Sequence, residues 1–459
     1  MPYQSTISST IQLGTVSVGA ANFGSTVFVT ANSYFTERLR PYMSMEEVRN
    51  DPAIPSDSNA YAGLLSAFKQ PGCAVPVWLG RRKADNATLT PVVADNKVYT
   101  FKIEVVADVD GSVPESGTIS FTSGTSATAD DIVTGLKASL TSESITLVTP
   151  TGTSELILTP TAGYSMNITA IANMTEVSAT TETAADLLAA IQAENNEDWY
   201  FLTCEDHTET FILAMSSAID ATESSNYTKQ YRVAIADANV LTPLADPAVD
   251  ILGKLKDGNF ARVQGEWHDQ ADVIFPEVAA TCYNGQFFPG TTTWKFMNNQ
   301  TGVPAARNLV TGAKLSTQLQ GYISDRNASW VGAERGVDFM HGGKLAGGEW
   351  IDVVRGKDWI NDTIEVRLTN LFLNAVGSKI SFSESGKAKV KGVIESVLNE
   401  AVQRDILLGY TPVEIPDNVS FEDQANRILK DVKWVGYLSG AIHFVIVNGV
   451  LTYQTAELD

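Results

Sequence analysis

Apolar residues recur at two different periods along the chain, and each period predicts a different kind of element. Residues 58–70 repeat their apolar positions at the spacing of one helical face, through Tyr61, Leu64, Leu65 and Phe68. This spacing is typical of an amphipathic helix. Ser58 can cap its start, and the Pro71–Gly72 pair is expected to end it. Short apolar runs at 25–30 and 73–82 predict strands on either side of this helix.

After about residue 181 the chain alternates between helix and strand patterns. A helical pattern at 183–192 is followed by a strand pattern at 198–204. A second helical pattern starts at His207 and is followed by a strand pattern at 231–237. A helix that connects two strands in this way usually makes them parallel, with the helix packed on the sheet. We therefore expect a partly parallel sheet covered by helices.

Residues 86–194 differ from the rest of the chain in charge. They hold 3 Lys and Arg against 13 Asp and Glu, so their net charge of −10 is about half of the total. Five short strand patterns surround one helix at 126–140, whose apolar stripe consists of Ile132, Val133, Leu136 and Leu140. Ser, Thr and Gly dominate the joints between these elements. This region is predicted to be a compact β-rich insertion with a solvated outer surface.

The last third of the chain mixes helix and strand patterns and holds the longest predicted helix, at 387–408. Its apolar stripe keeps a 3.6-residue period through Val390, Val393, Ile394, Val397, Leu398, Ala401 and Val402. Residues 311–374 before it are of mixed character. The end of the chain, 441–455, resembles a hairpin, because Asn448–Gly449 is a strong turn signal.

The N-terminal stretch at 5–19 has strand propensity but little apolar surface. Its apolar residues, some of them at a period of two, are Ile7, Ile11, Leu13, Val16 and Val18. Such a segment cannot fold alone. It is either a frayed terminus or an arm that adds a strand to another sheet.

The charge balance excludes several classes of partner. The 459 residues carry 32 Lys and Arg against 53 Asp and Glu, a net charge of −21. Such a chain repels nucleic acid and anionic membrane surfaces. No apolar run approaches the roughly 20 residues of a membrane-spanning helix, and the N-terminus shows no signal-peptide pattern. The three cysteines, Cys73, Cys204 and Cys282, are far apart and odd in number, which argues against a disulfide framework.

Motifs for catalysis and cofactors are missing from the sequence. It contains no GxxxxGK[ST], no GxGxxG after a strand, no GxSxG and no HExxH. The best remaining candidate for a metal or a nucleophile is the run Cys204–His207. Neighbouring residues at a strand end point to opposite sides, so these side chains are not expected to converge. We therefore predict a protein that is not an enzyme and holds no cofactor.

The stretch GGEWIDVVRGKDWI, residues 347–360, is dense in charged and aromatic residues. If 349–354 is a strand, Trp350 and Asp352 share one of its faces. Arg355, Lys357 and Asp358 would then follow in a turn. Because Trp and Arg are favoured interface anchors, the stretch is interpreted as an intersubunit surface rather than a catalytic site. The predicted surface residues are Trp350, Asp352, Arg355, Lys357, Asp358 and Trp359.

The helix predicted at 387–408 carries Lys387, Lys389 and Lys391 in its first turns. Cations at this end oppose the helix dipole. Solvated lysines are the simpler explanation, but in so acidic a chain the three residues also suggest contact with an acidic partner.

Three segments occur in the order seen in one known family. They are PGTTTWKFMNNQTGV at 289–303, then 347–360, then the long helix followed by ILLGY and by WVGYLSGAIHFVIVNGV. This order resembles that of contractile tail sheath proteins of myovirus-type bacteriophages and related injection machines. The resemblance covers roughly residues 270–459 and is weaker in the first 90 residues. The acidic insertion departs from the better-known sheaths.

The resemblance implies a structural protomer of the virion, assembled in the bacterial cytoplasm. Such protomers stack as six-fold rings around an inner tail tube and contract to drive the tube through the host envelope. Partners would be other copies of the chain, the tube protein, and the baseplate and tail terminator proteins. Terminal arms donate strands to neighbours, which adds Val450, Leu451 and Tyr453 to the candidate arm residues. The basic start of the 387–408 helix would face the tube.

We therefore expect a multidomain α/β and α+β fold: a mixed-sheet core with packed helices, a β-rich inserted domain and extended terminal arms. The predicted divisions are an N-terminal arm at 1–20, an α/β middle domain at 21–90 and 181–300, the outward-facing insertion at 91–180, a C-terminal sheath core at 301–449 and a C-terminal arm at 450–459. Two other classes stay open. One is a carbohydrate-binding or adhesin-like protein, and the other is an α/β enzyme whose site has no recognised motif.

Overall fold

A computed structural model describes residues 22–449, except 33, 36, 84, 110, 197, 225–227 and 299. The described part divides into two compact units, and the boundary between them in the sequence lies between Val366 and Arg367. Each unit is described by itself below. Both candidate arm segments, with Ile7, Ile11, Leu13, Val16 and Val18 at one end and Val450, Leu451 and Tyr453 at the other, lie outside the described residues.

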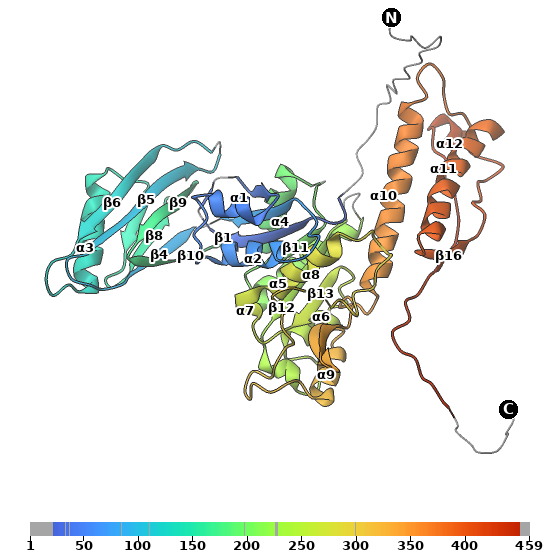
Figure 1. The fold of residues 1–459 in the computed structure, drawn as a ribbon. Helices are drawn as coiled ribbons and strands as arrows, with labels where there is room; N and C mark the ends of the chain where they lie inside the picture. Colours follow the sequence, from blue (N-terminus) through green and yellow to red (C-terminus); the bar gives the residue numbers. More distant parts are fainter. Residues whose placement is uncertain are drawn as a thin grey trace, which may run out of the picture. The chain divides into compact units, whose positions relative to one another are not determined.

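The first unit, up to Val366, is built on a six-stranded sheet with the order β13-β12-β11-β1-β3-β2 (Figure 1). All neighbouring strands are parallel except β2 and β3. This confirms the partly parallel sheet that the alternating patterns predict. The strands are β1 Thr26–Ala31, β2 Leu39–Tyr42, β3 Val77–Arg82, β11 Phe201–Cys204, β12 Gln230–Ile235 and β13 Val263–Trp267.

Helices cover both faces of this sheet. Strand β1 accordingly directs its apolar residues alternately to one face and to the other. Phe28 faces one core cluster with Leu64 of α2 and Val278 of α8. Val27 and Val29 face the other, with α5 and α6. The helices are α1 Met45–Asn50, α2 Asn59–Phe68, α4 Ala184–Glu194, α5 Glu209–Asp220, α6 Ile251–Asp257, α7 Ala271–Ile274, α8 Pro276–Gly285 and α9 Thr317–Ser324, with 3₁₀ turns η1 Ala221–Ser224 and η2 Ala238–Leu241.

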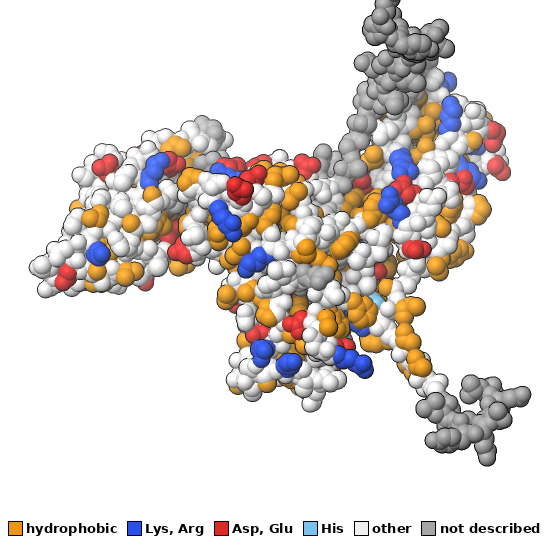
Figure 2. Space-filling view, in the orientation of Figure 1, with side chains coloured by type: hydrophobic (Ala, Val, Ile, Leu, Met, Phe, Trp, Pro, Cys, Tyr) orange, Lys and Arg blue, Asp and Glu red, His pale blue; other side chains and the backbone are white. Residues whose placement is uncertain are grey.

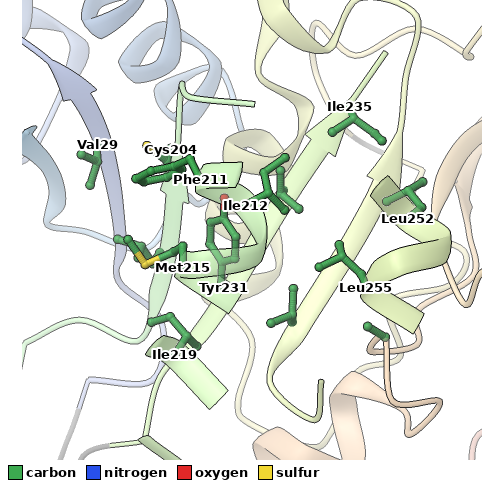
Figure 3. Close-up of a cluster of buried hydrophobic side chains, with 14 of the residues drawn as sticks. Val29, Cys204, Phe211, Ile212, Met215, Ile219, Tyr231, Ile235, Leu252 and Leu255 are labelled. Carbon is green, nitrogen blue, oxygen red and sulfur yellow. The ribbon is translucent and has the colours of Figure 1, made fainter. Parts of the chain in front are cut away.

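In the second of these core clusters, one face of helix α5 packs on the sheet (Figure 3). Phe211, Ile212, Met215 and Ile219 of α5 lie together with Val29, Cys204 and Tyr231 of the sheet, and all of them are buried. On the other side of the sheet, helix α2 begins where predicted, since Ser58 Oγ accepts the Tyr61 N–H at 3.2 Å. The local capping signal therefore fixes the start of the helix. Of its predicted apolar face only Leu64 is buried, while Tyr61, Leu65 and Phe68 are half-buried.

Residues 86–179 form two antiparallel sheets with their own core. The sheets have the orders β10-β4-β8-β7 and β6-β5-β9. Helix α3 packs its stripe of Ile132, Val133, Leu136 and Leu140 into the shared cluster, as predicted. The elements are β4 Asn86–Pro91, β5 Val98–Ala107, β6 Glu115–Thr122, α3 Ala129–Ser142, β7 Val148–Thr151, β8 Leu156–Pro160, β9 Tyr164–Ala172 and β10 Met174–Ala179.

Residues 301–366 belong to the same compact unit as the six-stranded sheet. They contain an antiparallel pair, β14 Trp330–Glu334 and β15 Val337–His341. Helix α10, Ile351–Leu373, begins here and runs across the division between the units. The strand predicted at 349–354 and the turn after it are therefore wrong, because this stretch is the end of a loop followed by the start of a long helix.

The second unit is small, and its described part contains α11 Glu384–Gln403, β16 Leu407–Tyr410, α12 Phe421–Ala425 and β17 Gly436–Leu438. The predicted apolar stripe of α11 is buried at Val390, Ile394, Val397, Leu398 and Ala401. Strands β16 and β17 form an antiparallel pair. The first half of the predicted terminal hairpin is wrong, since residues 439–449 take no strand conformation. None of the described helices is long and apolar enough to cross a membrane.

Candidate assembly surfaces

The charged and aromatic stretch at 347–360 lies largely inside the first unit. Within α10, Asp352, Asp358 and Trp359 are buried, and Arg355 is only 1% exposed. Their helical spacing brings them to the side that packs on the unit, whereas a strand would have divided them between two faces. For these four residues the expectation of a surface read by another chain does not hold in the described chain.

Asp358 is the centre of a buried ion pair. Arg262, which precedes β13, donates to both carboxylate oxygens, at 2.7 and 2.8 Å. The Tyr200 hydroxyl also donates to Asp358 Oδ2, at 2.6 Å. Burial and then the Asp358 charge raise the pKa of Tyr200 well above its ordinary value. Burial alone would lower the pKa of Arg262, but its bonds to Asp358 raise it.

Arg355 is buried without a carboxylate partner among the described residues. Its guanidinium donates to three main-chain carbonyl oxygens, those of Phe23 at 2.9 Å, Asn284 at 3.3 Å and Phe287 at 3.4 Å. It also lies 5.2 Å from the ring centroid of Phe201. Burial lowers the pKa of Arg355 to about 10. The residue therefore ties α10 to two separate segments of the first unit, the one before β1 and the end of α8.

Two of the six predicted surface residues remain accessible. The Lys357 side chain is 56% exposed and pairs with Glu223. Trp350 is half-buried, with the Lys344 ammonium 5.2 Å from its ring centroid. An intersubunit role for this stretch thus stays a proposal for Trp350 and Lys357.

The three lysines of α11 have different environments. Helix α11 starts three residues earlier than predicted, with Ser383 as its N-cap and Glu384 in its first turn. Lys387 is buried, and its ammonium donates to the carbonyl oxygens of Pro416 and Asp417, at 2.9 and 2.6 Å. Of the predicted tube-facing residues, therefore, only Lys389 and Lys391 present an accessible charge.

The end of the second unit exposes an unusual amount of apolar surface. Ile442, Phe444, Val445, Ile446 and Val447 are 76–88% exposed. Figure 2 shows them as the orange run that leads to the grey C-terminal residues. Single exposed apolar residues are common, but five in six consecutive positions mark an interaction surface. The sequence pattern indicates a strand-forming segment here, whereas residues 439–449 take no strand conformation in the described chain.

Close to this segment in the sequence lies a short sheet with apolar residues on its surface. Besides the β16–β17 pairs, Thr411 donates to the Val435 carbonyl at 2.8 Å, and Glu414 pairs with Lys433 in both directions. Leu408, Val435, Tyr437 and Leu438 are more than half exposed. Helix α11 packs on β16. Neither outer edge of this two-stranded sheet is paired with another described strand, and such pairs are marginal without further strands.

The Cys204–His207 run does not form a chemical site. Cys204 lies in a core cluster. Glu205 accepts from the Ala31 N–H at 2.5 Å, Asp206 pairs with Arg82 at 2.5 Å, and His207 pairs with Asp272 at 2.6 Å. A polar cavity of about 480 Å³ at the carboxyl ends of β1, β3 and β11 is lined by Arg82, Cys204, Glu205 and Asp206, but not by His207. Each is already engaged, and among the described residues no group of His, Cys, Asp and Glu could hold a metal.

Comparisons with known proteins agree on the fold. No family model matches the chain, and no curated protein sequence matches it either. Solved structures do. The sheath of the anti-feeding prophage in its contracted state is similar with a TM-score of 0.54 and 13% identity, over 98% of this chain and 99% of that chain.

Two further structures give the same result. A protein in the six-fold symmetrised baseplate of the anti-feeding prophage matches with a TM-score of 0.53 and 12% identity, over 98% of this chain and 99% of that one. A sheath tail protein from Desulfitobacterium hafniense matches with a TM-score of 0.51 and 10% identity, over 90% and 93%. The chain therefore has the fold of the contractile tail sheath proteins.

Proposed function

We propose that the chain is a structural protomer of a contractile sheath and polymerises by exchanging strands between copies. One observation carries the proposal: the exposed apolar segment at 442–447 belongs to the same chain as an open-edged two-stranded sheet. A segment of one copy that pairs with the sheet of another would bury both surfaces. It would also satisfy the main-chain groups along the sheet edge.

Such a contact joins two different surfaces, head to tail. A contact of this kind can repeat from copy to copy, so it generates rings or an open helical assembly rather than a closed dimer. In this proposal six copies form a ring, rings stack around an inner tail tube, and the N-terminal residues 1–20 supply a second donated strand. The baseplate and tail terminator proteins would bound the stack at its two ends.

Contraction in this scheme needs no catalytic site. Subunits would move as rigid bodies from a metastable extended packing to a better packed one, with the linkers next to the donated strands as hinges. The movement would drive the tube through the envelope of a host cell for genome delivery. The chain would then be a component of the virion, assembled in the bacterial cytoplasm.

The competing proposal of a carbohydrate-binding protein has less support. It needs an accessible platform of Trp and Asp side chains. Asp352, Asp358 and Trp359 are buried, and the Asp358 carboxylate is fully engaged by Arg262 and Tyr200. The sheath proposal requires no such platform.

The test is assembly of a matched pair of variants. Ile446 is 88% exposed in the proposed arm, and Val310 is 85% exposed elsewhere. Replacing either by Asp leaves the folded chain intact, since neither side chain is packed. We expect Ile446→Asp to abolish tubes or stacked rings in negative-stain electron microscopy at rising protein concentration. Val310→Asp should assemble as the unchanged chain does.

Removal of residues 1–19 tests the second arm in the same assay. The truncated chain is expected to remain folded by circular dichroism but to lose polymerisation. Normal assembly of both Ile446→Asp and the truncated chain would overturn strand exchange. If the unchanged chain stays monomeric even with tail tubes present, the sheath proposal itself would be rejected.

A further inference from the structure

Two of the three cysteines, 209 positions apart in the sequence, come together beside one core cluster of the first unit. Cys282 lies on α8, is fully buried and belongs to the cluster. Cys73 follows the end of α2, is half-buried and packs against the same cluster. The Cys73 thiol donates to the Ala74 carbonyl oxygen at 3.5 Å, and the Ala74 main chain in turn contacts Cys282.

Two main-chain contacts hold the Cys73 loop against the end of α8. The Ala74 N–H donates to the Cys282 carbonyl oxygen at 3.4 Å. On the other side of Cys73, the Pro71 carbonyl accepts from Gln286 Nε2 at 2.8 Å. Because Cys73 lies between these two anchors, its backbone is held close to that of Cys282. This meets the main geometric need of a disulfide, which is a pair of backbones already close.

The two thiols differ in access to solvent. Burial raises the pKa of the Cys282 thiol well above its ordinary value, and neighbours include the hydroxyls of Thr26 and Thr281. That thiol is therefore hidden from solvent, and it reacts only when it loses its proton to the leaving hydroxyl of an oxidised neighbour. Cys73 is the one that a small oxidant in solution can reach. Cys204 lies in the other core cluster, on the opposite face of the sheet, and cannot compete.

We propose that Cys73 and Cys282 are a modification site at which a peroxide oxidant joins the two sulfurs in an intramolecular disulfide. Hydrogen peroxide first oxidises the Cys73 thiol to a sulfenic acid and releases one water. The Cys282 sulfur then attacks the Cys73 sulfur, and its proton leaves with the sulfenic hydroxyl as a second water. Two thiols and one peroxide thus give one disulfide and two waters.

The disulfide would link the loop between α2 and β3 covalently to α8. Both helices cover the same face of the six-stranded sheet. The disulfide would therefore cross-link two segments of one helical layer of the first unit. The proposal does not depend on the sheath role, because it concerns one chain. Its outcome can therefore be told apart from that of the assembly experiments.

The experiment is peptide mapping of the full chain. The reduced protein is treated with hydrogen peroxide, its remaining thiols are alkylated after unfolding, and unreduced digests are read by mass spectrometry. We expect one cross-linked peptide pair that contains Cys73 and Cys282, a chain lighter by two hydrogen atoms, and an alkylated Cys204. A reducing agent should restore both thiols.

Two single variants serve as controls. In Cys282→Ser, the Cys73 sulfenic acid should persist and react with dimedone. In Cys73→Ser, Cys282 should remain a free thiol after the same treatment. The proposal is overturned if, in the unchanged chain, Cys73 is oxidised or linked to a second chain while Cys282 stays a free thiol.

Discussion

Arg262 and Asp358 are separated by 96 residues in the sequence, yet their side chains form a buried two-bond ion pair. The exposed fractions of the two side chains are 0% and 1%. A buried charge that loses its partner is strongly unfavourable. This pair therefore determines how firmly α10 is held to the first unit.

The first prediction follows from this pair. Asp358→Asn should lower the free energy of unfolding by about 3 kcal/mol, because the Arg262 charge then stays buried without its main partner. Urea denaturation measures the change. Glu223→Gln is the control, since Glu223 also pairs with Arg262 but its side chain is 41% exposed. That change should cost less than about 1 kcal/mol. Equal losses in the two variants would contradict the assignment.

The second prediction concerns His207. Burial alone would lower its pKa, but hydrogen bonds to Asp272 and Glu277 raise it to about 10. The folded chain thus binds this proton more tightly than the unfolded chain does. Its contribution to stability is full below pH 6.5, the ordinary value, and is lost as the pH rises through about 10.

The measurement is the free energy of unfolding of the unchanged chain and of His207→Gln between pH 6 and pH 10. The difference between the two should be largest at the low end. It should then fall with a slope of at most roughly 1.4 kcal/mol per pH unit, the limit for one proton. A difference that is constant over this range would show that folding does not raise the pKa of the histidine.

The third prediction compares two helical glycines. A Cβ atom at Gly63 of α2 would lie 2.1 Å from Cε1 of Phe28, a buried ring of the core. Gly63→Ala should therefore destabilise the chain by about 1–3 kcal/mol. At Gly321 of α9 the same atom would meet no described atom within 4 Å. Gly321→Ala should stabilise by up to about 1 kcal/mol through helix propensity. Thermal unfolding of both variants tests the opposite signs.

Elements with a clear local period were predictable from the sequence. Helix α3 buries the four residues that the period assigns to its inner face, and β1 alternates between two cores. In α2 only Leu64 of the predicted face is buried, while Tyr61, Leu65 and Phe68 are half-buried. Each of these signals lies within about a dozen residues, so no distant contact is needed to interpret them. The parallel sheet followed from the alternation of such elements.

The stretch at 347–360 was misinterpreted because its decisive contacts are distant. Arg355 is satisfied by the Phe23 carbonyl, 332 residues away, and Asp358 by Arg262. Charged residues are rarely buried unless paired, and the partners cannot be seen in the local sequence. A short apolar alternation is also compatible with either a strand or a helix. The thiol pair Cys73 and Cys282 was missed for the same reason.

The start of α11 was misplaced for a more local reason. Ser383, with its side chain accepting the Gly386 N–H at 3.3 Å, was not recognised as the N-cap. The helix therefore has Glu384 in its first turn, which suits the dipole. With this start, the three lysines lie further from the N-terminal end of the helix than predicted, so they oppose the dipole less. The role of each lysine then depends on its own contacts.

The last prediction separates the lysines of α11 by role. Lys387→Met should cost about 1–3 kcal/mol of stability, because the buried ammonium of Lys387 and its two hydrogen bonds to the carbonyl oxygens of Pro416 and Asp417 are lost. Lys389→Glu combined with Lys391→Glu should change stability by less than about 1 kcal/mol, since both side chains reach solvent. This double variant should instead bind preformed tail tubes more weakly in co-sedimentation, if an acidic tube faces α11. Unchanged co-sedimentation would remove α11 from the tube-facing surface, and it would leave the strand-exchange contacts as the part of the sheath proposal still to be tested.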